Sequence, residues 1–297
     1  GDNYLPNKQS QFEQAEKFLM QKKYFQASEL LTKCYSQHQN FRTNYLLFKA
    51  LTKSQQDHAA VDLAQDYLNS YIADNDLFLE LLKAMGQDHQ YIAMRILYQQ
   101  LEPCMKDTEQ TFFDETILQF EQQADPLWIR KIVFESAGME LVPPSEQRRL
   151  LKKIYSLPVK LLVNIAPNIL ASTTIHPLIK VDLLDTLRKL KINESFDFVF
   201  INGEHYQVSP AKLPNEQSSE VKKRLFALLP DHTDQALLVA QQAEISLKLL
   251  LLYPFATTII KVNHGWLDAL VKGETAALSI SEKEIAVKLT ELLDQWA

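Results

Sequence analysis

Apolar side chains recur along the first third of the chain with a period of about 33 residues. Ala27, Ala60 and Ala93 are spaced at this interval, and apolar side chains follow each of them three and four places later. That spacing puts the side chains on one face of a helix, and a small alanine lets a second helix cross closely. One helix pair cannot bury its own apolar face, so pairs must stack. The pattern therefore predicts three stacked antiparallel helix pairs.

The helix that precedes each of these alanines keeps the same period, because Ala15, Phe48 and Leu81 occupy corresponding positions. The first unit also carries the small and aromatic positions of a tetratricopeptide (TPR) repeat, at Ala15, Phe18, Tyr24, Ala27, Leu31 and Cys34. Residues 8–105 therefore resemble the TPR superfamily.

The later units depart from the TPR pattern, because Asp57 and Gln90 stand where the first unit has an aromatic residue and the closing proline is missing. The resemblance implies an all-α fold built as a right-handed superhelix of helix pairs. The alternative is a set of antiparallel helices without a true repeat.

Three parts are predicted along the chain: TPR-like repeats over 1–105, a continuing helical solenoid over 106–195, and a β-hairpin with C-terminal helices over 196–297. Beyond the repeats, the apolar pattern and the helix-start signals predict a series of further helices. Their expected ranges are 107–123, 126–140, a helix after an N-cap at Ser145, 159–165, 167–171, 177–190, 216–229, 233–253, 263–273 and 281–296, with the N-cap of the 233–253 helix at Thr233 or Asp234.

Two β-prone runs, 196–201 and 204–208, flank Asn202-Gly203. Asn-Gly between such runs favours a two-residue type I′ turn, which needs positive φ at both residues. The sequence therefore predicts a two-stranded hairpin packed on helices. Across its whole length the chain resembles TPR-containing proteins of Gram-positive bacteria such as lactic acid bacteria, on segments 175–180, 208–214 and 252–255. That group implies no activity for this chain.

Composition narrows the function classes. A formal net charge of −6 and a pI near 5.7 argue against duplex nucleic-acid binding as the main task, since that needs cations to displace counterions from phosphates. The exception is a basic helix at 148–153, with Arg148, Arg149, Lys152 and Lys153, which carries an alternative hypothesis of a nucleic-acid-associated regulator. With 6 Gly in the chain, a glycine-rich phosphate cradle is disfavoured.

Catalytic and metal-binding motifs are missing from the sequence, and the 7 His are scattered. The prediction is a non-enzymatic protein with no cofactor and no metal, and the enzyme alternative places a site near the hairpin around His205. Cys34 and Cys104 lack a CxxC spacing and are interpreted as buried apolar side chains in a reducing compartment. The apolar run 245–260 contains Lys248 and Pro254 and is too short to span a bilayer. We therefore expect a cytoplasmic protein with no membrane association.

The TPR resemblance also implies a binding face, because the first helix of each pair lines the concave groove in that family. In the 33-residue register this groove would present Phe12, Glu13, Glu16, Arg42, Tyr45, Lys49, Lys53, Asn75 and Phe78. The mixture suits a bound peptide or amphipathic helix. The recurrence of Phe12, Tyr45 and Phe78 is equally consistent with packing between repeats. The carboxylate clamp of co-chaperone TPRs is not matched, since Phe12, Glu16 and Leu46 occupy its places. The sequence thus predicts a protein-interaction scaffold.

Overall fold

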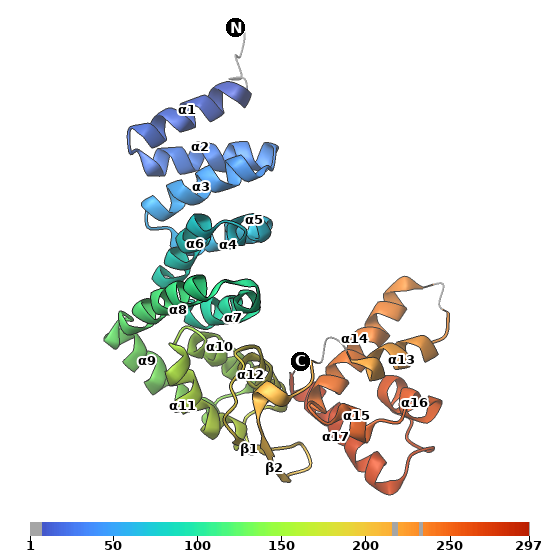
Figure 1. Ribbon diagram of the computed structural model, residues 1–297. Helices are drawn as coiled ribbons and strands as arrows, with labels where there is room; N and C mark the ends of the chain where they lie inside the picture. Colours follow the sequence, from blue (N-terminus) through green and yellow to red (C-terminus); the bar gives the residue numbers. More distant parts are fainter. Residues whose placement is uncertain (1–7, 216–218, 232–233, 297) are drawn as a thin grey trace. The chain divides into compact units, whose positions relative to one another are not determined.

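The computed structural model describes residues 8–215, 219–231 and 234–296, and most of them are helical (Figure 1). Within these ranges the β-structure consists of one two-stranded antiparallel sheet, so the all-α class with a small hairpin is confirmed. The chain forms two compact units. Unit 1 comprises residues up to Asp125 together with 156–158, and unit 2 comprises 126–155 and 159–297. The division into three parts at 105 and 195 stays a prediction.

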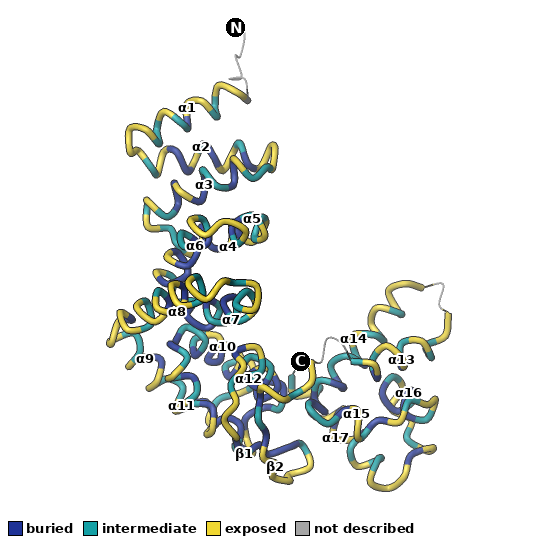
Figure 2. The backbone as a smooth tube through the Cα atoms, in the orientation of Figure 1, coloured by how far each residue is buried: buried dark blue, intermediate teal, exposed yellow. Residues whose placement is uncertain are grey.

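Unit 1 is a stack of helices in which each packs on the next along the chain (Figure 1). Its elements are α1 (Lys8–Met20), α2 (Tyr24–Gln37), α3 (Phe41–Lys53), α4 (Asp57–Ala64), η1 (Gln65–Tyr67), α5 (Leu68–Ile72), α6 (Asn75–Gln87), α7 (Tyr91–Leu101), η2 (Glu102–Cys104) and α8 (Asp107–Gln122). In Figure 2 the buried stretches lie in the middle layers, whereas α1 buries little besides Ala15. The layers between α2 and α8 therefore hold the core of this unit.

The turns inside the three helix pairs repeat one backbone geometry. Lys22, Gln55 and His89 each have positive φ, at 58°, 61° and 56°. In each turn the next amide donates to the carbonyl five residues earlier, which is the bond of a Schellman motif. These bonds are Lys23–Phe18 at 2.8 Å, Gln56–Leu51 at 2.8 Å and Gln90–Met85 at 2.9 Å. The repeat is thus visible in the backbone, with spacings of 33 and then 34 residues.

The longer second spacing corrects the uniform 33-residue register. The position of Ala27 and Ala60, both fully buried, is taken in the third pair by Met94 at 0% exposure, while Ala93 is half-buried. The amides of Ala27, Ala60 and Met94 make the same first-turn bond to the carbonyl four residues earlier. The cause lies in the second pair, whose second helix is broken into α4, η1 and α5 and needs extra length.

Replacing Gln55 with glycine is expected to raise the free energy of unfolding of unit 1 by about 0.5–1 kcal/mol. The left-handed conformation costs an L-residue roughly 1–2 kcal/mol, and glycine avoids that cost while losing some of the gain to unfolded-chain entropy. Thermal unfolding followed by circular dichroism measures the change. Gln55→Ala is the matched control, since alanine keeps the Cβ, and an equal gain from both variants would contradict the explanation.

A buried polar network ties the first pair to the second. Asn44, at 0% exposure, donates through Nδ2 to the Tyr35 hydroxyl at 3.1 Å and to the Leu63 carbonyl at 2.9 Å. Its Oδ1 accepts from the hydroxyl of Tyr71 at 2.6 Å, and Tyr71 is also fully buried. The Tyr35 hydroxyl donates onward to Asp66 at 2.6 Å. Asn44 therefore has donor and acceptor groups satisfied inside the core, as buried amides require.

Unit 2 combines helices with the hairpin. Its elements are α9 (Pro126–Ser136), η3 (Met139–Leu141), α10 (Pro144–Ile154), α11 (Val159–Leu170), α12 (Pro177–Lys189), β1 (Phe196–Val199), β2 (His205–Val208), η4 (Pro210–Lys212), α13 (Glu220–Leu228), α14 (Gln235–Leu251), α15 (Ala256–Ile259), α16 (His264–Lys272) and α17 (Ile280–Trp296). α12 is central, because α10, α11, η4 and α14 all contact it.

Several predicted helix boundaries in unit 2 are wrong. The predicted helices 159–165 and 167–171 form one helix, α11, which contains Pro167. The N-cap of α10 is Pro143 and not Ser145, because Pro144 occupies the first helical position that favours proline. Asp234 caps α14 as predicted, by accepting from the amides of Ala236 and Leu237. The alternative cap Thr233, and the predicted start of the 216–229 helix, lie outside the described residues.

The hairpin is present, but its turn differs from the predicted type I′. β1 pairs antiparallel with β2 in a register that joins Phe196 to Val208 and Val199 to His205. The amide of Gly203 donates to the Phe200 carbonyl at 2.9 Å, and Gly203 alone in the turn has positive φ, at 81°. The connection is therefore a longer turn that closes with glycine in the left-handed region, which also fits the strand twist.

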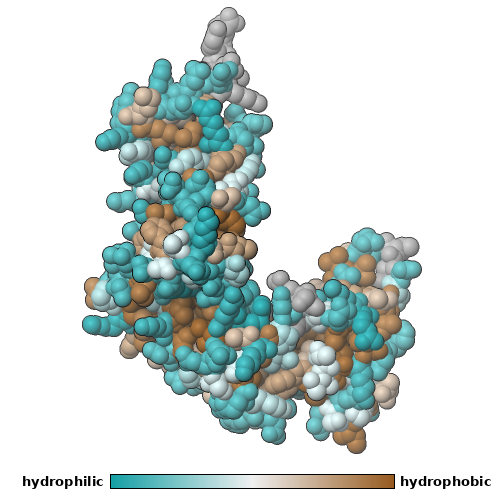
Figure 3. Space-filling view, in the orientation of Figure 1, coloured by the Kyte–Doolittle hydropathy of each residue, from teal (hydrophilic) through white to brown (hydrophobic). Residues whose placement is uncertain are grey.

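Exposed apolar side chains mark part of the surface of unit 2. Figure 3 shows brown side chains on the N-terminal half of α14, where Leu237 and Val239 are 44% and 62% exposed. Across the described ranges, no helix combines the length and the apolar character needed to cross a membrane.

The prediction that both cysteines are buried is wrong for Cys104, which is exposed. Cys34 is only partly buried.

Candidate functional site

The predicted binding face of unit 1 begins with contacts between α1 and α3. Arg42 lies with its guanidinium 5.0 Å from the ring centre of Phe12 and 3.1 Å from Glu16 Oε1. Phe12 is half-buried and Glu13 is exposed. Arg42 and Glu16 are side chains on the surface, where such an ion pair contributes only about 0–1 kcal/mol. These residues hold neighbouring helices together and leave Glu13 free to contact solvent.

The next aromatic positions pack between successive helix pairs. The Tyr45 hydroxyl donates to Glu80 Oε1 at 3.2 Å. Phe78 is 1% exposed and its ring centre lies 4.7 Å from that of Phe113. Phe78 is therefore part of the core and is inaccessible to a partner, because the 34-residue spacing turns it inward. Asn75 stays exposed and donates to Glu109 Oε2 at 2.6 Å.

A cavity of about 300 Å³ opens between α3 and α6 beside this face. Three lysines line it: Lys49 and Lys53, which were predicted from their first-helix positions, and Lys83, which was not. Lys83 follows Lys49 by 34 residues, so the 33-residue register assigned its place to Leu82. The complete lining is Phe48, Lys49, Thr52, Lys53, Asp57, Glu80, Lys83, Ala84 and Gln87.

The three lysines that line this cavity are not paired with carboxylates in the described part of the chain. Among the described residues none of the three lysines lies within ion-pair distance of a carboxylate; the Lys49 ammonium instead lies 5.4 Å from the ring centre of Tyr45. Two acidic side chains, Asp57 and Glu80, also line the cavity, and the buried Oε2 of Glu80 has no hydrogen-bond partner among the described residues. Burial and the adjacent Glu80 carboxylate raise the pKa of Tyr45 to about 12, so its hydroxyl stays a donor. The cavity thus offers ammonium groups to an incoming acceptor.

The nucleic-acid alternative rested on the basic helix α10. Most of the cationic side chains of this helix contact other side chains of the protein. The Arg148 guanidinium lies 3.9 Å from the ring centre of Trp296. Arg149 pairs with Glu146 at 2.9 Å, and Lys153 pairs with Glu135 at 2.8 Å. Cations that already neutralise carboxylates release fewer counterions from a phosphate backbone. This geometry therefore offers little support for the nucleic-acid alternative.

His205, which carried the enzyme alternative, is exposed on β2. Its Nδ1 lies 3.0 Å from Asp197 Oδ2 across the hairpin. Asp197 could orient the exposed imidazole, but among the described residues no hydroxyl or thiol that could act as a nucleophile is hydrogen-bonded to His205. Within the described ranges, no three His, Cys, Asp or Glu side chains gather to hold a metal ion.

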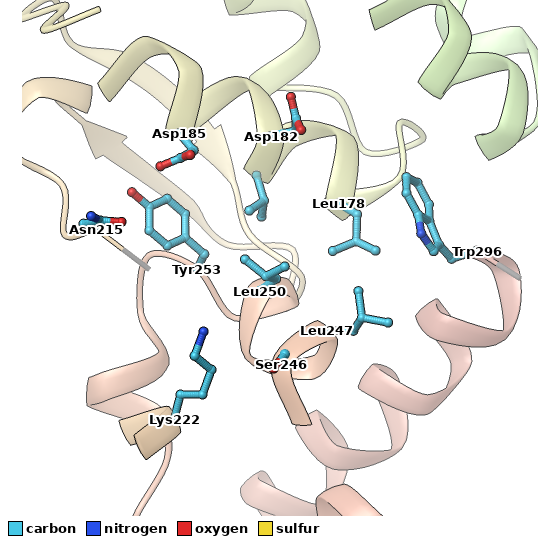
Figure 4. Close-up of a pocket in the computed structure, with 11 residues that line it drawn as sticks. Leu178, Asp182, Asp185, Asn215, Lys222, Ser246, Leu247, Leu250, Tyr253 and Trp296 are labelled. Atoms are coloured by element: carbon cyan, nitrogen blue, oxygen red, sulfur yellow. The ribbon is translucent and has the colours of Figure 1, made fainter. Parts of the chain in front are cut away.

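A second cavity, of about 350 Å³, lies inside unit 2 between α12, α13, α14 and α17 (Figure 4). The sequence analysis did not find it, because its lining comes from distant segments with no shared period. Leu178, Val181, Leu247, Leu250 and Trp296 supply apolar surface, and Asp182, Asp185, Asn215, Lys222, Ser246 and Tyr253 supply polar groups.

Comparison with known proteins found no matching family model, no matching curated protein and no matching solved structure.

Proposed function

We propose that this protein is a non-enzymatic interaction scaffold, in which the first helices of unit 1 bind an acidic peptide or the acidic face of an amphipathic helix. The stack of helix pairs is proposed to form a right-handed, TPR-like superhelix, with α1, α3 and α6 on its concave side. The observation that carries the proposal is the lysine-lined cavity between α3 and α6.

The positive side chains on the lining of the cavity support a peptide with acidic side chains. The ammonium groups of Lys49, Lys53 and Lys83 line one depression of about 300 Å³ without ion-pair partners among the described residues. Charge-assisted hydrogen bonds from such groups to carboxylates are roughly twice as strong as neutral ones. Phe48 and Ala84 lie behind this lining at 1% and 2% exposure and offer little surface to a ligand, so the proposed recognition rests on the lysines.

The test is a selection of peptides from a displayed random library on the full-length protein, followed by affinity measurement with synthetic copies. The expected result is an acidic consensus whose affinity falls at least tenfold in the Lys49→Glu/Lys53→Glu variant, because attraction becomes repulsion at two positions. Affinity is also expected to fall with rising salt concentration, since exposed charges are screened.

The matched control is Lys33→Glu/Lys131→Glu, which changes net charge equally at exposed positions on α2 and α9 that do not line this cavity. Circular dichroism establishes that both double variants keep their helical content. Equal loss of affinity in the two variants would mean that net charge alone attracts the peptide. Selection of peptides with no acidic preference would also contradict the proposal.

A further inference from the structure

The cavity in unit 2 is apolar at one end. Leu178 from α12, Leu247 and Leu250 from α14, and Trp296 from α17 gather there, as Figure 4 shows. The indole of Trp296 is held in place, because the Arg148 guanidinium lies 3.9 Å from its ring centre and the His176 ring lies 4.8 Å from it. A fixed aromatic wall with leucines opposite is the usual lining of a site for a small apolar group, and about 350 Å³ falls within the roughly 300–1,000 Å³ of ligand pockets.

Polar groups gather at the other end of the cavity. Figure 4 shows Asp185, Asn215 and Tyr253 there, with the amino group of Lys222 directed toward the space between them and the leucines. The Tyr253 hydroxyl donates to the Pro214 carbonyl at 2.7 Å, so its donor is already used. The cavity is therefore polarised, with an apolar part and a polar part.

The charges at the polar end leave a cation for a ligand. Asp185 is neutralised by Arg188 at 2.8 Å and Lys189 at 3.3 Å on its own helix. Asp182 accepts the hydroxyl of Tyr155, and in Figure 4 its carboxylate points away from the leucines. Lys222 makes no ion pair with any residue in the described part of the chain. An anionic head group at Lys222 would give it a carboxylate partner that the described residues do not supply.

We propose that this cavity binds a small amphipathic carboxylate, with its hydrocarbon part between the leucines and Trp296 and its carboxylate at Lys222. This site is separate from the peptide-binding face proposed for unit 1, and either can fail without the other. Both ends contribute: burial of the hydrocarbon part favours binding, and the ammonium–carboxylate contact selects the sign of the head group.

The test is calorimetric titration of the full-length protein with decanoate, and with decyltrimethylammonium as the probe of opposite charge, both at concentrations where they stay monomeric. The expected result is saturable binding of decanoate at least tenfold tighter than that of decyltrimethylammonium. Decanoate should also change the tryptophan fluorescence, and this change should disappear in Trp296→Phe.

Lys222→Met is expected to weaken decanoate binding about tenfold, because it removes the cation and keeps the aliphatic stem. Lys223→Met is the matched control, since Lys223 is the exposed neighbour on α13 and does not line the cavity; its affinity should equal that of the wild type. Leu247→Phe, which fills the apolar end, should abolish binding without lowering the thermal midpoint by more than a few degrees. Absent binding, equal affinity for the two probes, or equal affinity of Lys222→Met and Lys223→Met would each overturn the proposal.

Discussion

Replacing Asn44 with alanine is expected to lower the free energy of unfolding of unit 1 by about 3–5 kcal/mol, the range for losing several buried hydrogen bonds at once. The substitution leaves the buried Tyr71 hydroxyl and the partly buried Leu63 carbonyl without their Asn44 partner. Each unsatisfied buried group costs about 1–3 kcal/mol, and alanine leaves a small cavity as well.

The positions of the tryptophans allow the unfolding of unit 1 to be measured separately from that of unit 2. All 3 Trp, at positions 128, 266 and 296, belong to unit 2, so tryptophan fluorescence follows that unit while circular dichroism follows both. In urea, Asn44→Ala should move an early part of the circular-dichroism transition to lower concentration and leave the fluorescence midpoint unchanged.

Two variants serve as controls for the Asn44 prediction. Tyr71→Phe removes a single hydroxyl from the same network and should cost about 1–2 kcal/mol. Asn69→Ala changes an exposed asparagine on α5 and should cost no more than about 0.5 kcal/mol. If Asn44→Ala were as mild as Asn69→Ala, the network would have no role in joining the first two helix pairs.

The repeat in unit 1 was predictable from sequence because its signal is local. A small or apolar residue every 33 positions identifies helix pairs whatever lies between them, and the elements around Ala27 and Ala60 follow that prediction. The exact register was not predictable, because Ala93 and Met94 are adjacent and both apolar. Only the broken helix from α4 to α5 shows that the third pair is displaced by one residue.

That single-residue displacement also decides which candidate binding residues were found. Lys49 and Lys53 precede the displacement, and both line the cavity as positions on a first helix. Phe78 and Lys83 follow it, so the former was placed on the binding face and the latter was missed. Side chains after an insertion rotate by about 100° around the helix, which exchanges core and surface positions.

The cavity in unit 2 could not be predicted in this way. Leu178, Lys222, Leu247 and Trp296 come from four helices with no common period, and only tertiary packing brings them together.

The positions of several helix-ending turns could not be predicted from the sequence either. Four left-handed turn positions are occupied by Lys22, Gln55, His89 and Lys191, which the usual glycine rule for helix ends does not detect, whereas Gly273 at the end of α16 follows that rule.

The second large effect is expected at His176, which is 3% exposed between α12 and α17. Its Nε2 lies 2.8 Å from the Leu292 carbonyl oxygen and must carry the hydrogen, so its Nδ1 is the acceptor for the Leu178 amide at 3.1 Å. The ring is therefore neutral, and it caps α12 while it holds α17. Burial, together with the nearby Arg148 guanidinium, lowers the pKa of His176 below its ordinary value of 6.5.

Because folding lowers the pKa of His176, its contribution to stability is lost as the pH falls. Above pH 6.5 His176 is neutral in both states and the stabilisation is complete. Below 6.5 the unfolded chain takes up a proton that the folded chain resists, so the free energy of unfolding falls by up to about 1.4 kcal/mol per pH unit until the folded-state pKa is reached. Protonation would place an Nδ1–H against the Leu178 N–H, which removes the cap.

Urea unfolding followed by tryptophan fluorescence between pH 7 and pH 5 tests this, since the signal excludes unit 1 and its His58–Asp88 pair. The contribution of that pair to stability depends on pH in the opposite direction. Asp88 raises the pKa of His58, and the resulting stabilisation is lost as pH rises. The wild type should lose stability as the pH falls over this range, by no more than about 1.4 kcal/mol per pH unit. His176→Asn keeps an N-cap acceptor but does not titrate, so it should begin less stable at pH 7 and lose clearly less on acidification. Parallel pH profiles for the two proteins would show that another group controls the acid sensitivity of unit 2.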